Sequence, residues 1–373
     1  MGLRIGPARR GPSRGWGLPT LVVGLLLAAC VGGGDDEDRG RSSNDPAEEV
    51  PDRAECPARE FEHRYGVTEF RGRPRRVVPV SIRDQEVLLS LGVVPAAVQD
   101  GGYRDPYPSW PWVPDALEEA DPDRLPSGQL NFEQIARLRP DVILGAAAAL
   151  TRREYRLLSR IAPTVAQSGV HVDHGVPWQD LTRTVGRLLC RTERADSLVA
   201  ALEERMGEVR SRHPELVGAS VVVGMPGGPE GTHWIYGPQD SRARLLAELG
   251  MDYPPEMAEL AGNRFVATVS AERMDILESD VLIWLATPEQ ARRLEANPLY
   301  GRLPAVEEGR VLYLEPYGVL SAALTNANAL NLPYILDRFV PLLVGAWAGE
   351  VSESDSTWGG AAWPPEPNER RQR

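Results

Sequence analysis

Apolar and polar positions in the central part of the chain follow a pattern that predicts strand, helix and strand in succession. Residues 75–98 (RRVVPVSIRDQEVLLSLGVVPAAV) combine a buried strand, VVPV, with a helix that stops at the glycine after Leu91 and a second strand. Residues 219–250 repeat this order, from the strand ASVVVGM to the helix SRARLLAELG. Alternating strands and helices with short links predict βαβ units on a mainly parallel sheet.

A short stretch of sequence occurs twice, once downstream of each of these units. Residues 131–145 (NFEQIARLRPDVILG) and 270–284 (SAERMDILESDVLIW) are identical at four of fifteen aligned positions, and Glu133 and Glu272 are one identical pair. In both copies an apolar stripe at helical spacing predicts a short helix that begins near the glutamate and turns into a strand. Two copies of the same order of elements predict two lobes.

The expected fold is therefore α/β, with two Rossmann-like lobes that have mainly parallel sheets, one long helix joining them, and a ligand cleft between the lobes. The joining helix is predicted by apolar residues at helical spacing over 178–212, with one central break near Arg191 and Thr192. The expected boundaries are 57–177 for the N-terminal lobe, 178–212 for the connecting helix, 213–347 for the C-terminal lobe and 348–373 for a disordered tail.

The N-terminus has the features of a bacterial lipoprotein signal. A basic start is followed by a short apolar run at 16–29 and by the sequence LAAC, which ends at Cys30. The run is too short to cross a bilayer as a helix. We expect residues 1–29 to be a signal peptide, Cys30 to carry lipid, and residues 30–56 to be a flexible tether. An ordinary secretory signal with a coincidental cysteine is the alternative.

Composition narrows the class of protein. The chain has 373 residues, of which 42% are hydrophobic and 25% charged, as in a globular protein, and its net charge of −12 argues against a nucleic-acid partner. It contains no lysine, and it lacks the G-x-S-x-G, H-E-x-x-H and paired-cysteine motifs of common enzymes and zinc sites. We therefore expect a binding protein rather than an enzyme. Cys56 and Cys190 remain outside the signal, and whether they form a disulfide is open.

The first lobe carries an insertion that the second lobe lacks, over QDGGYRDPYPSWPWVPDALEEADPDRLPSG. Clustered aromatic residues in a loop rich in proline and glycine predict ligand contact. The candidate residues here are Tyr103, Arg104, Tyr107, Trp110 and Trp112.

A second aromatic loop, MPGGPEGTHWIYGPQD, follows the first strand of the C-terminal lobe, and it lies where open α/β sheets bind ligands. The candidates in this loop are His233, Trp234 and Tyr236, and further candidates elsewhere are Arg83, Trp178, Arg264 and Tyr317. His171 and His174 could offer two metal ligands, but no acidic third ligand follows at a recognisable spacing, so no metal site is expected.

Several of these stretches, taken in order, resemble the iron–siderophore substrate-binding proteins of ABC transporters. The stretches are RRVVPVSIRDQEVLLSLGVVPAAV, NFEQIARLRPDVILG, LSRIAPTV, PWQDLTRTVGRLL and NPLYGRLPAVEEGRVLYLE. The resemblance is to the class with a helical backbone, which also includes vitamin B12 and haem binders, and it covers roughly residues 57–345. The sequences PWV and PWQD are similar to those of the Gram-positive actinobacterial branch.

The resemblance implies capture of a ferric siderophore between the lobes and its delivery to a membrane permease, by a monomer held on the outer face of the cytoplasmic membrane. Iron would arrive already chelated, so no cofactor and no protein metal ligand is implied. Glu133 and Glu272 match the positions that meet arginines on the two permease subunits in this family. In our own interpretation, each glutamate could equally stabilise the start of its helix.

Other ligands and other classes of function are also compatible with the sequence. Haem is the closest rival and would need an axial ligand, for which Tyr103, His171, His174 and Tyr317 are available. Cobalamin is bound by proteins of the same class. A lipoprotein adhesin or sensor, or an extracellular enzyme on a duplicated scaffold, are the alternatives outside transport.

Overall fold

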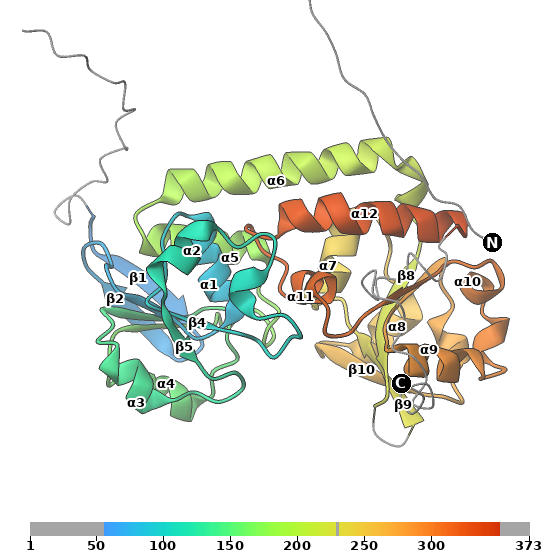
Figure 1. The fold of residues 1–373 in the computed structure, drawn as a ribbon, viewed down its shortest axis with the longest axis horizontal. Helices are drawn as coiled ribbons and strands as arrows, with labels where there is room; N and C mark the ends of the chain where they lie inside the picture. Colours follow the sequence, from blue (N-terminus) through green and yellow to red (C-terminus); the bar gives the residue numbers. More distant parts are fainter. Residues whose placement is uncertain (1–55, 229–230, 351–373) are drawn as a thin grey trace, which may run out of the picture. The chain divides into compact units, whose positions relative to one another are not determined.

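Each repeated unit builds one lobe of an α/β fold, and both lobes belong to one compact unit (Figure 1). The computed structural model describes residues 56–228 and 231–350. The expected signal peptide, Cys30 with its expected lipid, and most of the expected tether and tail lie outside these residues. Within them, no helix is long and apolar enough to cross a membrane.

The N-terminal lobe is built on short parallel strands. Its strands are β1 Arg59–His63, β2 Gly66–Phe70, β3 Val77–Pro79, β4 Ala97–Gln99, β5 Asp123–Leu125, β6 Val142–Gly145 and β7 Thr164–Ala166. Its helices are α1 Ile82–Ser90, the 3-10 turn η2 Tyr107–Ser109, α2 Asp115–Ala120, α3 Phe132–Arg137, α4 Arg152–Leu158 and α5 Trp178–Leu188. Strands β3, β6 and β7 form one parallel sheet, β4 pairs in parallel with β5, and β1 and β2 form an antiparallel hairpin.

The C-terminal lobe contains a five-stranded sheet in the order β10-β9-β8-β11-β12. Its strands are β8 Val221–Pro226, β9 Thr232–Tyr236, β10 Val266–Ser270, β11 Val281–Leu285 and β12 Val311–Leu314. Its helices are η3 Pro214–Leu216, α7 Ser241–Glu248, α8 Pro255–Ala261, η5 Met274–Leu277, α9 Pro288–Glu295, η6 Tyr300–Arg302, α10 Pro304–Glu307, α11 Val319–Thr325 and α12 Leu332–Ala348. Strands β8, β11 and β12 are parallel, which confirms the predicted fold class, and β9 runs antiparallel to both of its neighbours.

The repeated sequence contains an aspartate that does the same structural work in both lobes. Asp141 accepts hydrogen bonds from the backbone amides of Arg75 (2.6 Å) and Arg76 (3.1 Å), just before β3. Asp280 accepts from the backbone amide and the hydroxyl of Ser220, both at 2.7 Å, just before β8. In each lobe the next residue pairs with the first residue of the neighbouring parallel strand. The duplication therefore extends to the register of the sheets. Each carboxylate accepts hydrogen bonds from backbone amides that precede the strand and so are not paired within the sheet.

The two copies differ at the predicted short helix. In the first copy Asn131 caps α3 by accepting from the backbone amide of Gln134, and Glu133 lies exposed in the first turn. In the second copy the matching Ser270 is the last residue of β10, and only the 3-10 helix η5 forms, without a side-chain cap. Glu272 is exposed in the turn before η5. The prediction that both glutamates lie in the first turn of an α-helix is thus correct for Glu133 and wrong for Glu272.

The connection over 178–212 consists of two helices rather than one, with the break where the sequence predicted it, and the long helix that joins the lobes is the second of them. Helix α5 ends at Leu188, and α6 (Thr192–Arg212) continues after a tight turn near the predicted break. Cys190 in this turn has a φ of 54°, a left-handed conformation that ends a helix. A Cβ at Gly186 would overlap Ala195, so glycine allows the two helices to pack closely.

Helix α6 links the cores of both lobes. Ala195, near its start, is buried in the apolar core of the N-terminal lobe. Val199, Leu202, Met206 and Val209 are buried in the core of the C-terminal lobe. At 21 residues the helix is roughly 30 Å long. Because one continuous helix is packed into both cores, it resists relative movement of the lobes.

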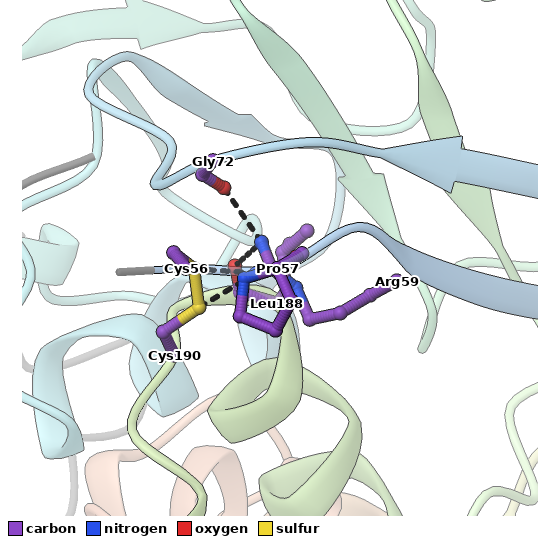
Figure 2. Close-up of a disulfide and its surroundings, with 6 residues drawn as sticks. All are labelled: Cys56, Pro57, Arg59, Gly72, Leu188 and Cys190. Carbon is purple, nitrogen blue, oxygen red and sulfur yellow. Dashed lines mark hydrogen bonds between the residues drawn. A yellow bond between two sulfur atoms is a disulfide. The ribbon is translucent and has the colours of Figure 1, made fainter. Parts of the chain in front are cut away.

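A disulfide joins Cys56, at the start of the N-terminal lobe, to Cys190 in the turn between α5 and α6 (Figure 2). The Cα atoms are 6.1 Å apart, within the range of ordinary disulfides. The guanidinium of Arg59 lies against this bridge and donates to the backbone carbonyls of Gly72 (2.7 Å) and Leu188 (3.1 Å). The question that the sequence left open is therefore answered by a covalent bond between segments 134 residues apart.

Candidate functional site

A pocket of about 330 Å³ lies at the carboxyl ends of β3, β4 and β6, the edge where open α/β sheets bind ligands. Most of its lining comes from the N-terminal lobe, and Asn326 at the end of α11 contributes from the C-terminal lobe. The lining residues with polar side chains are Ser81, Arg83, Gln99, Gln129, Glu154, His174 and Asn326. The His174 ring also meets the ring of Phe265, from the C-terminal lobe, at 5.9 Å between centroids. The volume is at the lower end of the range for small-molecule sites.

Four consecutive polar residues at the start of α1 organise this pocket. Residues 83–86 (RDQE) are all buried, although a run of charged and amide side chains on a helix usually faces water. Each of the four side chains hydrogen-bonds to a different segment of the chain. Helix α1 therefore acts as the common support for the segments that form the pocket.

Arg83 and Asp84 fix the loops on two sides of the pocket. Arg83 donates to the backbone carbonyls of His174 (3.0 Å) and Val176 (2.7 Å), and burial lowers its pKa to about 10. Asp84 accepts from the backbone amide of Ala147 (3.1 Å), directly after β6, and from the hydroxyl of Ser81 (2.6 Å). Burial raises the pKa of Asp84 to about 6 despite these hydrogen bonds. The loop after β6 and the loop that carries His174 are thus held by ionisable groups that have little water around them.

Gln85 and Glu86 complete the support. Gln85 accepts from the backbone amide of Gln99 (2.8 Å) and donates to its carbonyl (3.1 Å), which holds the end of β4 at the pocket. Glu86 accepts from the indole nitrogen of Trp112 at 2.7 Å and from the side-chain amides of Asn328 and Asn331. The two asparagines belong to the C-terminal lobe, so Glu86 lies where the lobes meet.

The aromatic insertion packs as a core between the lobes, which corrects the prediction that all of its rings contact ligand. Tyr107 and Trp110 are fully or almost fully buried, together with Leu117 of the same insertion and Ala322 of α11. The rings of Tyr107 and Trp110 meet edge to face at 5.0 Å, and the Trp110 indole donates to the carbonyl of Asp105. Neither ring offers a surface to a ligand in this structure. Trp112 is half-buried and its indole nitrogen is bonded to Glu86.

Tyr103 is the residue of the insertion that lies beside the pocket. Its hydroxyl accepts from the side chain of Asn326 at 3.3 Å, and Asn326 lines the pocket. Tyr236 of β9 belongs to the same neighbourhood, because the guanidinium of Arg242 lies 3.4 Å from its ring centre and donates to Thr325 at 3.1 Å. Tyr103 and Tyr236, which the sequence placed on two separate loops, are brought together here, while ligand contact by either remains a prediction.

The buried pair of Arg242 and Asp240 supports this corner of the site. The carboxylate of Asp240 receives two hydrogen bonds from the guanidinium, at 2.8 and 2.7 Å. Both side chains are almost fully buried, and the carboxylate holds the pKa of Arg242 above its usual value, against the effect of burial. Arg242 is therefore a fixed cation whose charge is already matched.

The other predicted ligand residues lie away from the pocket lining. Trp178 is buried in the core of the C-terminal lobe and donates to Glu248 at 2.8 Å, so it too packs as a core residue. Trp234 is half-buried in β9, where the sequence predicted a loop; the physical reason is that it pairs with both β8 and β10. Arg264 is exposed and donates to carbonyls at the end of α8.

Arg104 and Tyr317 form a contact between the insertion and the loop after β12. The backbone amide of Arg104 donates to the carbonyl of Tyr317 at 3.1 Å, and its guanidinium pairs with Glu315. Tyr317 is 58% exposed, which makes it the most exposed of the predicted aromatic residues in the described chain. Contact of either residue with a ligand stays a prediction.

The structure adds residues that the sequence did not single out. These are Asp84, Gln85, Glu86, Gln99, Gln129, Glu154, Asn326, Asn328 and Asn331. Two sequence features could have pointed to them: the polar run RDQE, which begins two residues after a serine cap, and the cluster of asparagines in TNANALN. Each resembles an ordinary polar surface segment until the fold is known.

The chemistry of the site suits binding. Among residues 56–228 and 231–350, no group of three or more His, Cys, Asp or Glu side chains could hold a metal ion. His171, a rival axial ligand, is hydrogen-bonded to Asp180 at 3.2 Å. Burial lowers the pKa of His174 below its ordinary value, so this ring is uncharged near neutral pH. The pocket thus offers amide groups, fixed charges and apolar surface.

The chain is similar to several proteins of known structure. One is PiaA of Streptococcus pneumoniae, which is described as an iron uptake ABC transporter substrate-binding protein and was solved in complex with ferrichrome. The complex matches with a TM-score of 0.70 and 26% identity, over 78% of this chain and 99% of PiaA. A periplasmic solute binding protein of Mycobacterium smegmatis matches with a TM-score of 0.67 and 27% identity, over 78% of this chain and 99% of its own.

Sequence comparison gives the same result. The "Probable siderophore-binding lipoprotein YfiY" of Bacillus subtilis is 23% identical over 264 residues, which are 67% of this chain and 78% of YfiY. The family model described as "Periplasmic binding protein" matches residues 77–317, from β3 to the loop after β12. The chain therefore belongs to the periplasmic binding protein family, whose two-lobed α/β fold it has.

Proposed function

We propose that the protein is the extracytoplasmic solute-binding component of an ABC importer and that it captures a ferric siderophore in the pocket beside α1. The observation that carries this proposal is the pocket itself, which lies at the carboxyl ends of three parallel strands and is completed from the other lobe by Asn326. The complex of the similar protein PiaA with ferrichrome supports the choice of ligand.

The charges around the pocket favour an uncharged chelate of the hydroxamate type. Its lining carries one cation, Arg83, and one anion, Glu154, and His174 is neutral at pH 7. Arg242 nearby is matched by Asp240, and Arg104 by Glu315. A catecholate or carboxylate chelate with several negative charges needs a site with net positive charge. This pocket offers little net positive charge to such a ligand.

The remaining parts of the proposal concern delivery. Iron arrives inside its chelate, so the protein needs no resident cofactor. Exposed Glu133 and Glu272, one from each lobe, meet arginines of the permease subunits. Lipid on Cys30 holds the monomeric protein on the outer face of the cytoplasmic membrane.

Binding can be tested directly by spectroscopy and titration. Protein purified from iron-starved native cells should show the broad charge-transfer band of a ferric chelate, whereas a sharp Soret band would assign haem instead. Purified protein should bind ferrichrome with submicromolar affinity by tryptophan fluorescence, and bind ferric citrate at least tenfold more weakly. Absence of a response to ferrichrome, ferric citrate and haemin would contradict the proposed function.

A variant that fills the pocket tests its location. Ala149 lies in the lining and is half-buried. Ala149→Trp should place an indole in a space of about 330 Å³ and weaken ferrichrome binding at least tenfold. Ala149→Ser, which adds one small hydroxyl, should bind nearly as well as the natural protein. If the tryptophan variant binds ferrichrome as tightly as the natural protein does, the binding site is not in this pocket.

A further inference from the structure

Glu86 receives hydrogen bonds from both lobes although it is fully buried. Its carboxylate accepts from Trp112 of the insertion at 2.7 Å, from Asn331 at 3.0 Å and from Asn328. All three donors are neutral. A buried carboxylate with three donors from two lobes is a costly arrangement, and it is kept only where the surrounding contacts define one geometry.

The asparagines belong to a turn that leads to the pocket. Asn331 accepts from the backbone amide of Asn328 at 3.0 Å and donates to the carbonyl of Asn326 at 3.1 Å. Asn328 accepts from the backbone amide of Leu330 at 2.8 Å. The side chain of Asn326 then donates to the hydroxyl of Tyr103 and lines the pocket. A continuous series of hydrogen bonds thus connects Glu86 to the ligand site.

We propose that Glu86 is a positioning residue for ligand binding: it holds residues 103–113 against the turn 326–331 and so places Tyr103 and Asn326 at the pocket. The proposal rests on the proposed function for the identity of the ligand. The joint between the two segments, defined by Glu86, Trp112, Asn328 and Asn331, exists independently of that function.

The joint depends on pH in a defined direction. Burial raises the pKa of Glu86 from its ordinary 4.5 to about 7, against the effect of its hydrogen bonds and of Arg83. If the joint opens, water reaches the carboxyl and the ordinary pKa returns. The closed joint therefore binds the proton more tightly, so acidification favours closure, and ionisation above about pH 7 favours opening.

Of the charged groups around Glu86, only Asp84 titrates close to this range. Arg83 keeps its charge because its pKa is about 10, and burial raises the pKa values of Tyr103 and Tyr107 above their ordinary 10. Asp84, the neighbour of Glu86, titrates near pH 6. Between pH 6 and 8.5 the two pKa values of Glu86 lower the ratio of closed to open joint by about tenfold.

Hydrogen exchange measures the opening directly and requires no ligand. After correction for intrinsic exchange, protection of the peptide over 326–331 should fall about tenfold between pH 6 and 8.5 in the natural protein. In Glu86→Gln, residue 86 cannot ionise and only Asp84 still titrates near this range, so protection should change much less. A flat profile in the natural protein, or the same slope in both proteins, would overturn the pH dependence of the joint, and equal protection of 326–331 in both proteins at every pH would overturn the positioning role of Glu86.

Titration with ferrichrome measures the positioning role. The amide introduced by Glu86→Gln would turn its nitrogen toward one of the three donors, so this variant should bind ferrichrome about tenfold more weakly at pH 7 while its circular dichroism and melting stay cooperative. Glu289→Gln, at an exposed position on α9, is the matched control and should bind normally. Unchanged affinity in Glu86→Gln would refute the role. If the natural protein binds no ferrichrome at all, the proposed function fails, while the exchange experiment still decides the joint.

Discussion

Removal of the disulfide between Cys56 and Cys190 should destabilise the protein more than the loss of most other single interactions would. The bond closes a loop across 134 residues, from the first described residue to the turn between α5 and α6. The double variant Cys56→Ser/Cys190→Ser removes it without leaving a free thiol. Arg59 keeps its bonds to the carbonyls of Gly72 and Leu188 in this variant, so the local fold should survive.

The magnitude follows from the length of the closed loop. Crosslinking a chain across 134 residues restricts the unfolded state by about 5 kcal/mol at 25 °C in the chain-entropy model. Removal of native disulfides from folded proteins typically costs about 2–5 kcal/mol. Since a typical domain has a net stability of only about 5–15 kcal/mol, this loss should be visible in any denaturation experiment.

Guanidinium denaturation followed by circular dichroism gives the free energy of unfolding. The double variant should lose about 3–5 kcal/mol, mainly through a lower midpoint, and dithiothreitol should lower the stability of the natural protein by a similar amount. The control is the double variant with dithiothreitol, whose stability should not change. A loss below about 1 kcal/mol, in natural protein whose bridge is verified by mass spectrometry, would refute the entropic reasoning.

Two further predictions concern the docking surface and the joint between the lobes. The variant Glu133→Arg/Glu272→Arg should abolish siderophore uptake by cells. Its ferrichrome affinity and melting temperature should stay unchanged, because both carboxylates are exposed and outside the pocket lining. Normal uptake would exclude a docking role for the two glutamates. Trp110→Ala should lower the free energy of unfolding by about 3–5 kcal/mol in urea denaturation, as expected for a buried indole. Near-normal stability combined with lost ferrichrome binding would instead support direct contact between this ring and the ligand.

Much of the fold could be predicted because its signals are local. Strand, helix and glycine stop follow one another over residues 75–98, and the order recurs after residue 219. The repeat of Asp141 and Asp280 proved to reflect equivalent positions at the edges of the two sheets. Periodicity and turn residues specify such units without knowledge of distant partners.

The site was harder to predict because its contacts are distant in sequence. Glu86 meets Asn331 across 245 residues and Asp84 meets Ala147 across 63, so nothing near either acid shows that it is buried. The aromatic composition of the insertion correctly indicated a special segment. Whether Trp110 faces a ligand or the other lobe depends on α11, which follows much later in the chain. Likewise β9 pairs with β10 beyond α7 and α8, which local sequence does not reveal.

The crosslink at Cys56 also has a mechanical consequence. Strand β1 begins three residues later as half of a hairpin, and hairpin bonds break one after another when an end is pulled. A force applied to the chain before Cys56 is transmitted through the disulfide to the turn between α5 and α6, and so bypasses the hairpin. Strand β1 would therefore stay paired with β2 under such a force, because the load falls on covalent bonds and packed helices.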